Sequence, residues 1–436
     1  MSLQHLLGES SAPRRAAQPY APTRRISPAN SVLVPISRAQ LAQCQTSINP
    51  LRTRPPVPSS SSGTASPLPI AIAGLPQKPQ GPLPPPDVGL APQQIGGGTP
   101  GGGRKRPIQA ERDLEEQRKR LRASGHDTRA VAEHYNARPN TDRESRRDSP
   151  IIGLKSFNNW IKSVLIAKHG RRETDTDKPK VRVLDLGCGK GGDLQKWSKA
   201  GTEEYVGIDI AFVSVEQARE RHQGLRGRKF PASFFALDCF ETSVLEVLDP
   251  SYFDPHPFDV VSMQFCMHYA LETEAKARQM LENVSRFLKP GGVFIGTIPD
   301  ANNLFSHLDD AATTTPNTPL EFGNSVYRVK FDQREWPSAY GHRYTFFLQD
   351  AVEEVPEYVV YWENFVALAA EYHLVPSYCQ DFASIFADEQ DDPHFAQLLR
   401  RMNVMDEDGN AEMDQDQLDA AMLYLGFVFT KEAPPA

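Results

Sequence analysis

Val181-Arg-Val-Leu-Asp-Leu-Gly-Cys-Gly-Lys-Gly-Gly-Asp193 is the stretch that decides the fold. It begins with a short run rich in apolar and β-branched residues, Val181–Leu186, which predicts a strand, and its glycines predict a tight turn. Apolar residues then recur at helical spacing from Leu194. The glycines at positions 187, 189 and 192 have the spacing that lets a backbone approach a nucleotide-containing ligand. We therefore expect a strand, a glycine turn and a helix at the start of an α/β sheet.

Acidic residues accompany three successive predicted strands. Asp185 lies inside the first, Asp209 ends Tyr205–Asp209, and Asp238 ends Phe234–Asp238. Ligands of open parallel sheets bind at the carboxyl ends of the strands. Asp185 would suit an ammonium group and repel a pyrophosphate, Asp209 can accept hydrogen bonds from two ribose hydroxyls, and Asp238 can accept one from an adenine amino group. The set predicts S-adenosylmethionine, although each acid alone is equally consistent with a strand-end or capping carboxylate.

The α/β pattern extends on both sides of this region. Phe258–Gln264 predicts a fourth strand, Thr273–Phe287 a helix, and Leu288–Thr297 a turn with a fifth strand. Before the sheet, Ile151–His169 has apolar residues at helical spacing, and Val131–Asn136 is the first folded element. The whole resembles the class I methyltransferase fold, a Rossmann-like and mostly parallel sheet with flanking helices.

The two ends of the chain differ in composition. Residues 1–110 hold 20 of the 37 prolines of this 436-residue sequence. The same residues include 11 Lys and Arg but only 2 Asp and Glu, so they are basic, whereas the sequence as a whole has a net charge of −7. Runs of Ser, Pro and Gly in this part bury almost no apolar surface. We predict a disordered basic tail over residues 1–125 and one catalytic domain over residues 126–436.

Two basic clusters, Arg104–Arg106 and Arg118–Arg120, lie about a dozen residues apart in the chain. This spacing favours a bipartite nuclear import signal, although the second cluster also suits an ordinary charged helix. The positive tail can contact phosphate or an acidic partner protein, or it can be solvated without a partner.

Several other classes of protein do not fit the sequence. No apolar run reaches the roughly 18 residues that span a bilayer. Met1–Pro13 has no basic region followed by an apolar core, so we expect no secretory signal there. Five scattered cysteines without metal-site spacing predict free thiols in a reducing compartment and no bound metal. Asp406–Asp416 is not an EF-hand, because Gly409 falls at the fourth position and not the sixth. Cys188 has no histidine nearby in the sequence and is expected to pack under the glycine turn. Without a legible heptad or apolar patch, we expect a monomer.

A narrower resemblance covers about residues 134–429. It rests on several blocks of sequence, namely His134-Tyr-Asn136, Phe157-Asn-Asn-Trp160 with Lys162, Leu184–Trp197, Asp209-Ile-Ala211, Gln264-Phe-Cys-Met-His-Tyr269, Pro356-Glu-Tyr358 and a late apolar strand around Tyr424. Together they resemble the mRNA cap guanine-N7 methyltransferases of fungi and animals. The tail and a predicted loop at Asp309–Leu320 lie outside the resemblance.

The resemblance implies a nuclear, RNA-binding transferase of mRNA processing. Its reaction moves the methyl group of S-adenosylmethionine to N7 of the terminal guanosine of GpppN-capped mRNA. The products are m7GpppN and S-adenosylhomocysteine. RNA polymerase II or other capping enzymes are candidate partners of the tail.

The resemblance also implies a role for individual residues. The residues expected to bind the methyl donor, to which the strand acid Asp185 is added from the argument above, are Lys162, Gly187, Asp209, Asp238, Gln264 and Tyr269. Those expected to bind the capped RNA are Asn158 and Asn159 near the triphosphate, Lys190, Lys196 and Arg221 as positive charge on the rim, and His268, Glu357 and Tyr424 around the guanine.

Side-chain chemistry is compatible with these roles. Lys162 can pair with the donor's carboxylate, and Tyr269 offers an aromatic face near its sulfonium. Glu357 can accept hydrogen bonds from two donors on one edge of guanine, and Tyr424 can stack on the base. Lysine and arginine suit a triphosphate.

Each cap residue also has an ordinary structural reading. His268 could be a satisfied core histidine, Glu357 a turn acid, and Tyr424 a packing residue. Arg221 could be a solvated residue of a charged helix.

No catalytic residue is predicted, because N7 of guanine has a free lone pair and carries no proton. It can attack the methyl group by in-line displacement without a general base. Proximity and orientation can then supply up to about 7–11 kcal/mol of the barrier reduction. Two alternatives remain open. One is a methyltransferase for another RNA or a small molecule, and the other is a non-catalytic scaffold that binds transcription machinery.

Overall fold

The computed structural model describes residues 126–138, 148–170, 181–252, 254–314, 320–406 and 408–433. The predicted basic tail and both basic clusters lie outside these residues, so the predicted disorder and import signal remain predictions. Within the described residues, no helix is both long and apolar enough to cross a bilayer.

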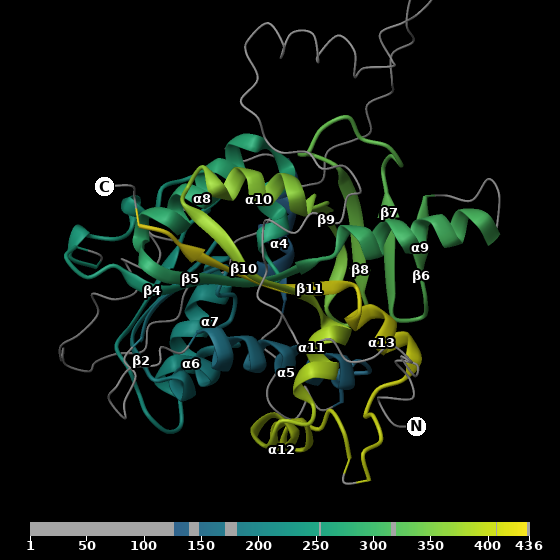
Figure 1. The fold of residues 1–436 in the computed structure, drawn as a ribbon, viewed down its shortest axis with the longest axis horizontal. Coiled ribbons are helices and arrows are strands. Elements are labelled where there is room, and N and C mark those ends of the chain that lie inside the picture. Colours follow the sequence, from purple (N-terminus) through teal and green to yellow (C-terminus); the bar gives the residue numbers. More distant parts are fainter. Residues whose placement is uncertain are drawn as a thin grey trace, which may run out of the picture. The chain divides into compact units, whose positions relative to one another are not determined.

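A seven-stranded sheet with the order β10-β11-β5-β4-β1-β2-β3 forms the centre of the domain (Figure 1). Its strands are β1 (Val181–Leu186), β2 (Thr202–Asp209), β3 (Ala232–Ala236), β4 (Phe258–Gln264), β5 (Leu288–Pro299), β10 (Leu374–Asp381) and β11 (Tyr424–Lys431). The five strands β1 to β5 pair in parallel, whereas β11 is antiparallel to both of its neighbours. The expected Rossmann-like, mostly parallel class I methyltransferase architecture is confirmed.

Helices cover both faces of this sheet. The helices of the described residues are α4 (His126–Ala137), α5 (Ile152–His169), α6 (Leu194–Ala200), α7 (Phe212–Gln223), α8 (Glu274–Phe287), α9 (Ala301–Thr314), α10 (Trp362–Ala370), α11 (Phe382–Glu389), α12 (Pro393–Arg401) and α13 (Gln415–Ala421). Short 3-10 turns are η2 (Val244–Glu246), η3 (Pro250–Tyr252) and η4 (Met267–Glu272). Apolar residues of α8 and α10 pack on one face, and those of α5, α6 and α7 pack on the other (Figure 1).

Chain order creates a switch point beside β1. The chain proceeds from β1 outward to β2 and β3, and then returns to place β4 on the other side of β1. The loops after β1 and β4 therefore diverge and leave a crevice at the carboxyl edge of the sheet, where ligands of open α/β sheets bind.

A second sheet was not predicted. It contains β6 (Glu321–Gly323), β7 (Tyr327–Phe331), β8 (Arg343–Leu348) and β9 (Val352–Tyr358), paired antiparallel in chain order. The prediction of a loop at Asp309–Leu320 is wrong for the first part of this segment, because α9 continues as a helix to Thr314.

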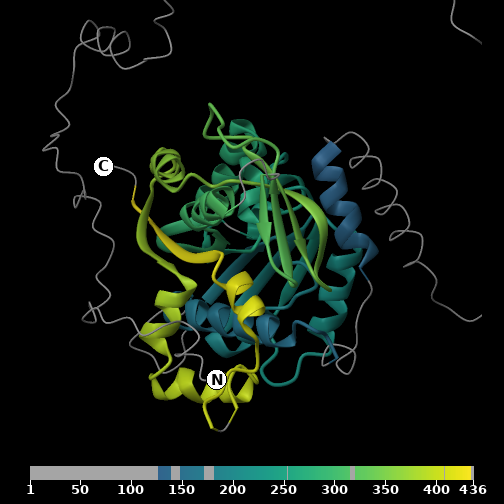
Figure 2. The ribbon, with the colours of Figure 1, turned by 90° about the vertical axis from the view of Figure 1, so that its right-hand side faces the viewer.

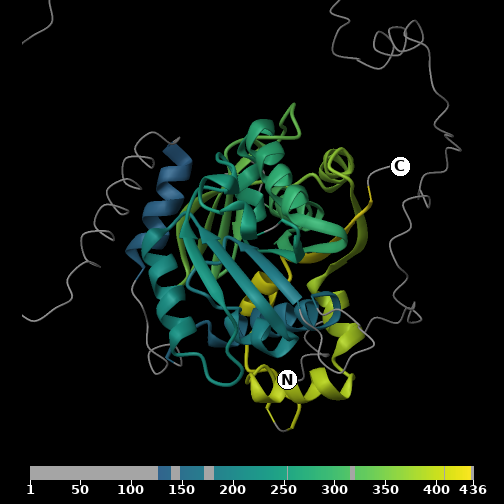
Figure 3. The same ribbon diagram turned by 90° about the vertical axis from the view of Figure 1, so that its left-hand side faces the viewer.

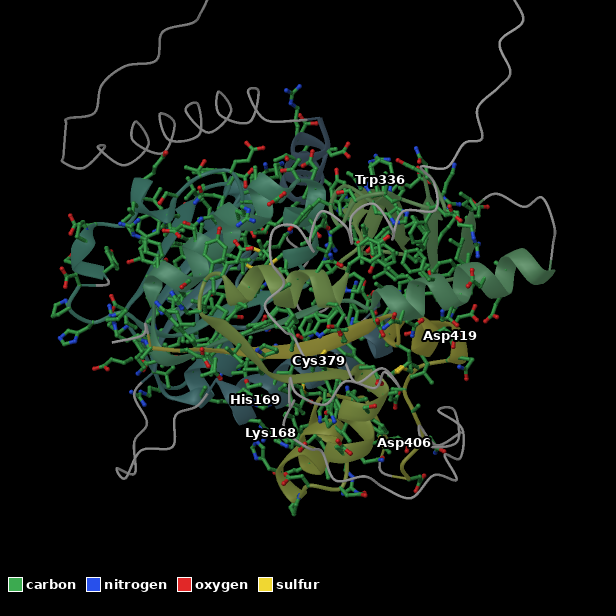
Figure 4. The ribbon with its side chains drawn as sticks, turned by 45° about the horizontal axis from the view of Figure 1, so that its top comes forward. Lys168, His169, Trp336, Cys379, Asp406 and Asp419 are labelled. Atoms are coloured by element: carbon green, nitrogen blue, oxygen red, sulfur yellow. The ribbon has the colours of Figure 1, made fainter. Side chains whose placement is uncertain are left out.

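The acidic segment after α12 has local structural roles. Asp406 accepts hydrogen bonds from the backbone and side-chain nitrogens of Asn410 at 2.7 and 2.9 Å. Asp406 and Asp419, which lies on α13, are labelled in Figure 4. Among the described residues, no cluster of acids, histidines and cysteines is arranged to hold a metal ion.

Gly296 on β5 leads to a prediction about stability. A Cβ atom there would collide with the Met263 carbonyl oxygen on β4 and the Phe427 ring on β11, so neither neighbour has room to yield. We expect Gly296→Ala to lower the free energy of unfolding by about 1–3 kcal/mol, as overpacked cores do. Urea denaturation measures the change. Gly224→Ala is the control, because its Cβ would meet backbone atoms only at 3.6 and 3.7 Å. Equal stability of the two variants would contradict the packing argument.

Candidate functional site

A cavity of about 440 Å³ opens at the carboxyl edge of the central sheet. Its volume lies within the range of small-molecule sites. The wall is formed by the glycine turn, by the loops that follow β2, β3 and β4, and by α4, which Figure 2 shows as the blue helix beside the antiparallel sheet. The cavity therefore lies at the switch point that chain topology defines.

The glycine turn presents bare backbone to this cavity. The nitrogens of Gly187 and Cys188 donate to the carbonyl oxygen of Ile208 at 2.7 and 3.0 Å, which fastens the turn to β2. Gly189 has a φ of 52° and lines the cavity. A Cβ on Gly189 would meet no atom within 4 Å, so a ligand can approach this backbone closely. Cys188 packs in the apolar cluster beneath the turn, as predicted.

Two of the predicted strand acids line the cavity. Asp209 accepts hydrogen bonds from the nitrogens of Gly189 and Ala211, both at 2.8 Å, which hold its carboxylate at the end of β2. Asp238 lies two residues beyond the end of β3 and accepts a bond from the Phe240 nitrogen at 2.9 Å through Oδ1. Its Oδ2 is buried without a partner among the described residues. Burial raises the pKa of both carboxyl groups.

Asp185 does not lie on the cavity wall. Its side chain is buried in β1 and accepts a hydrogen bond from the Tyr205 hydroxyl of β2 at 2.6 Å. Burial, together with the nearby Asp193 carboxylate, raises the pKa of Asp185 to about 7. The structure thus places Asp185 in the sheet behind the cavity wall, and its contact with a ligand stays a prediction.

Lys162 lines the cavity from α5 within a buried charge cluster. Its Nζ lies 2.9 Å from Asp193, and the Lys196 Nζ lies 2.7 Å from the same carboxylate. Burial alone would raise the pKa of Asp193. The two ammonium groups outweigh burial and hold this pKa well below its ordinary value. Burial lowers the pKa of Lys196 to about 8. The cluster carries one more positive than negative group, which suits an incoming carboxylate.

Gln264 and Phe265 continue the wall at the end of β4. Phe265 has a φ of 60°, and its nitrogen donates to the carbonyl oxygen of Thr297 on β5 at 3.1 Å. A non-glycine residue in this region is strained, and such strain concentrates at functional sites. Lys162 Nζ lies 5.9 Å from the centre of the Phe265 ring.

Tyr269 connects the cavity to a buried polar group behind it. It lines the cavity, and its hydroxyl donates to Glu357 Oε1 at 3.4 Å. The Tyr344 hydroxyl donates to Glu357 Oε2 at 2.8 Å. His268 Nε2 lies 3.4 Å from Glu357 Oε1, but neither of its ring nitrogens forms a hydrogen bond within the described part of the chain. A nearly fully buried carboxylate and an unsatisfied imidazole thus adjoin the cavity.

Of the remaining predicted residues, some line the cavity and others do not. Lys190 and Arg221 line the cavity, and the Lys190 Nζ donates to the carbonyl oxygen of Arg138 at 2.9 Å. Asn159 accepts from Lys196 at 3.0 Å. Six predicted RNA-binding residues do not form the cavity wall, namely Asn158, Asn159, Lys196, His268, Glu357 and Tyr424.

Tyr424 begins β11 and packs edge-on against Phe265 and beside Phe382, with ring centroids 4.9 and 5.9 Å apart. It is 8% exposed, so packing accounts for most of its surface. Its contact with Phe265 nevertheless places it directly behind the cavity wall.

Sequence reasoning did not single out two tyrosines of the site. Tyr135 on α4 lines the cavity, and its hydroxyl lies 3.3 Å from the Tyr269 hydroxyl. Tyr135 belongs to the block His134-Tyr-Asn136, but the family resemblance assigned no role to its side chain. Tyr344 gave no local signal, because only the pairing of β8 with β9 places it opposite Glu357.

Comparison with known proteins reveals close relatives. A family profile described as the mRNA (guanine-N(7))-methyltransferase domain matches residues 118–432. An mRNA cap guanine-N(7) methyltransferase of Cryptococcus neoformans is 42% identical, over 97% of this chain and 74% of that protein. The Schizosaccharomyces pombe protein of that name is 46% identical, over 69% of this chain and 81% of its own. An Arabidopsis thaliana relative, mRNA cap guanine-N(7) methyltransferase 1, is 42% identical over 70% of this chain and 81% of that protein.

The buried Asp185 leads to a prediction about pH. An acid whose pKa is higher in the folded state binds its proton more tightly there, so it stabilises the fold at low pH. This contribution is lost as pH rises from about 4 to about 7. We expect the stability of Asp185→Asn relative to the original chain to increase between about pH 5 and pH 8, as measured by urea denaturation. The exposed substitution Asp408→Asn should show no such trend. A constant or declining difference for Asp185→Asn would refute this assignment.

Proposed function

The chain belongs to the mRNA (guanine-N(7))-methyltransferase family, and we propose that it methylates the cap by holding its two substrates in line, without a general base. The single observation that carries this proposal is Tyr269, which lines the cavity and donates to the buried carboxylate of Glu357. One side chain thus joins a site for the methyl donor to a group suited to guanine.

The residues of the cavity fit S-adenosylmethionine. Lys162 offers an ammonium group for the donor's carboxylate, and the open backbone at Gly189 admits a ligand at close range. Asp209 can accept from ribose hydroxyls. Asp238 Oδ2, which has no partner within the described part of the chain, can accept from the adenine amino group. When bound, this co-substrate supplies an electrophilic methyl group on a sulfonium.

Glu357 is suited to the edge of guanine. Guanine presents an N1–H and an amino group side by side, and a carboxylate accepts from both. Glu357 is nearly fully buried, so the low local polarity strengthens such bonds. Tyr344 and Tyr269 already orient its two oxygens. His268, whose ring nitrogens have no hydrogen-bond partner among the residues that the structure describes, adds a further polar group beside the same carboxylate.

The tyrosines and cysteines of the cavity are compatible with a reaction without a base. Burial raises the pKa of Tyr135 to about 12 and the pKa of Tyr269 well above its usual range, so both hydroxyls keep their protons near neutral pH. Burial likewise raises the pKa of the Cys188, Cys239 and Cys266 thiols, all of which line the cavity. Because thiolates are the nucleophilic form, these cysteines do not compete with guanine for the methyl group.

Glu357→Gln tests the guanine assignment. The amide cannot accept two hydrogen bonds from guanine as a carboxylate does, and a lost charged hydrogen bond costs about 1.5–3 kcal/mol. We expect the KM for GpppN-capped RNA to rise at least tenfold, with the KM for S-adenosylmethionine changed less than twofold. Label transfer from radiolabelled donor to cap measures both constants.

Glu354→Gln is the matched control, because Glu354 lies on the same strand but pairs with Arg328 at the surface. It should leave both constants unchanged. The guanine assignment would be abandoned if Glu357→Gln left the KM for capped RNA at its original value.

We further propose that the protein acts in the nucleus and that its basic tail contacts RNA polymerase II or other capping enzymes. The two basic clusters at residues 104–106 and 118–120 support import, and the excess of 11 Lys and Arg over 2 Asp and Glu in residues 1–110 supports an acidic partner.

A fluorescent protein fused to residues 1–125 should accumulate in the nucleus if the clusters act in import. Replacement of the six Lys and Arg residues of the two clusters by Ala should return it to an even distribution, because the receptor loses its ionic contacts. Microscopy measures the ratio of nuclear to cytoplasmic signal. An equal ratio for both fusions would exclude an import role for these clusters.

A further inference from the structure

We propose that Asp127 is a positioning residue that holds α4 across the cavity as a strap, and that this strap sets the affinity for the methyl donor. The inference rests on the proposed function only in identifying the ligand of the cavity. It concerns Asp127 and its partner Arg343, which the sequence did not single out.

Asp127, in the first turn of α4, forms a clasp with the antiparallel sheet. Its Oδ2 accepts from the Arg343 Nε and from the Tyr358 hydroxyl, both at 2.7 Å. Arg343 begins β8, Tyr358 ends β9, and the two are paired in register. The side chain of Asp127 is 16% exposed and that of Arg343 33% exposed, so water screens this ion pair only in part.

The other end of α4 contacts α7 and the glycine turn. The Val213 nitrogen, in the first turn of α7, donates to Asn136 at 3.0 Å. Lys190 of the glycine turn donates to the carbonyl oxygen of Arg138, directly after the helix, at 2.9 Å. Figures 2 and 3 show α4 alongside both the antiparallel sheet and α7. The helix therefore joins the two halves of the cavity.

Residues of α4 also form part of the cavity wall. Val131 and Tyr135 line it between the two attachments, and Tyr135 meets Tyr269. Asp127 and Tyr358 of the clasp line it as well, together with Thr128. Release of the clasp would consequently open the wall itself.

The position of α4 depends largely on polar contacts. α4 has 12 residues, and among its described side chains only Val131 and Ala132 are buried. An isolated helix of this length is marginal in water, so its position depends on what it contacts. Asp127 supplies the acceptor for two of the bonds at its first turn, and loss of that acceptor should loosen the helix while the central sheet stays intact.

Asp127→Ala is the direct test, since alanine keeps the helix propensity high but removes the acceptor. Hydrogen–deuterium exchange of the unliganded protein should be at least tenfold faster at α4 amides and unchanged in β1 to β5. The Kd of S-adenosylhomocysteine by calorimetry, and the KM of S-adenosylmethionine, should rise about tenfold, and Asp127→Asn should recover part of the loss.

Asp332→Ala is the matched control. Asp332 accepts from the Nη1 of the same Arg343 at 2.8 Å, but it lies between β7 and β8 and is not on the cavity wall. This variant should leave α4 exchange and donor affinity unchanged. The proposal is overturned if Asp127→Ala leaves α4 exchange or donor affinity unaltered, or if Asp332→Ala matches its effects.

Should Asp127→Ala accelerate exchange throughout the protein, Tyr358→Phe removes only one of the two bonds. It is then expected to raise exchange in α4 alone, and unchanged exchange in α4 would refute the strap. Exchange without ligand does not depend on which substrate is methylated. A failure of the proposed function would appear as absent cap methylation by the original chain.

Discussion

The attachment of the glycine turn to β2 is the constraint on which the rest of the site depends. Gly187 and Cys188 donate to Ile208, and Gly189 donates to the carboxylate of Asp209. These bonds fix the turn at the switch point of the sheet and orient the Asp209 carboxylate on the cavity wall. They require a backbone with positive φ at Gly187 and Gly189, which side chains rarely tolerate. The donor cavity follows from this turn, and the neighbouring loops need only complete its wall.

Local periodicity predicted the parallel part of the fold well. β1 and β4 have the bounds expected from the sequence, and α8 differs from its prediction by one residue. The antiparallel sheet was missed because its strands are defined by long-range pairing, such as that of Tyr344 with Glu357. Of the predicted site, Asp209 and Asp238 reach the cavity because strand ends in a parallel sheet converge.

Asp185 shows where such reasoning ends, since a strand position does not reveal whether a side chain faces a ligand or a neighbouring strand. Glu357 was expected only from a family resemblance, and no local pattern connects it to the donor site. Burial also changes what these groups can do. It leaves the cavity's phenols and thiols protonated, and it places the Glu357 carboxylate where hydrogen bonds to it are strong. These protonated phenols and thiols fit the proposed reaction, in which the site binds and orients two substrates and no side chain removes a proton.

The pH dependence of the methyl-transfer step tests this account most directly. Single-turnover rates, with donor and GpppN-capped RNA both saturating, isolate that step from binding and product release. Because N7 carries no proton and no side chain must accept one, the rate should change less than about twofold between pH 6 and pH 8.5. A rate that rises tenfold per pH unit up to a single pKa, and that loses this rise on replacement of one side chain, would reveal a general base and contradict the account.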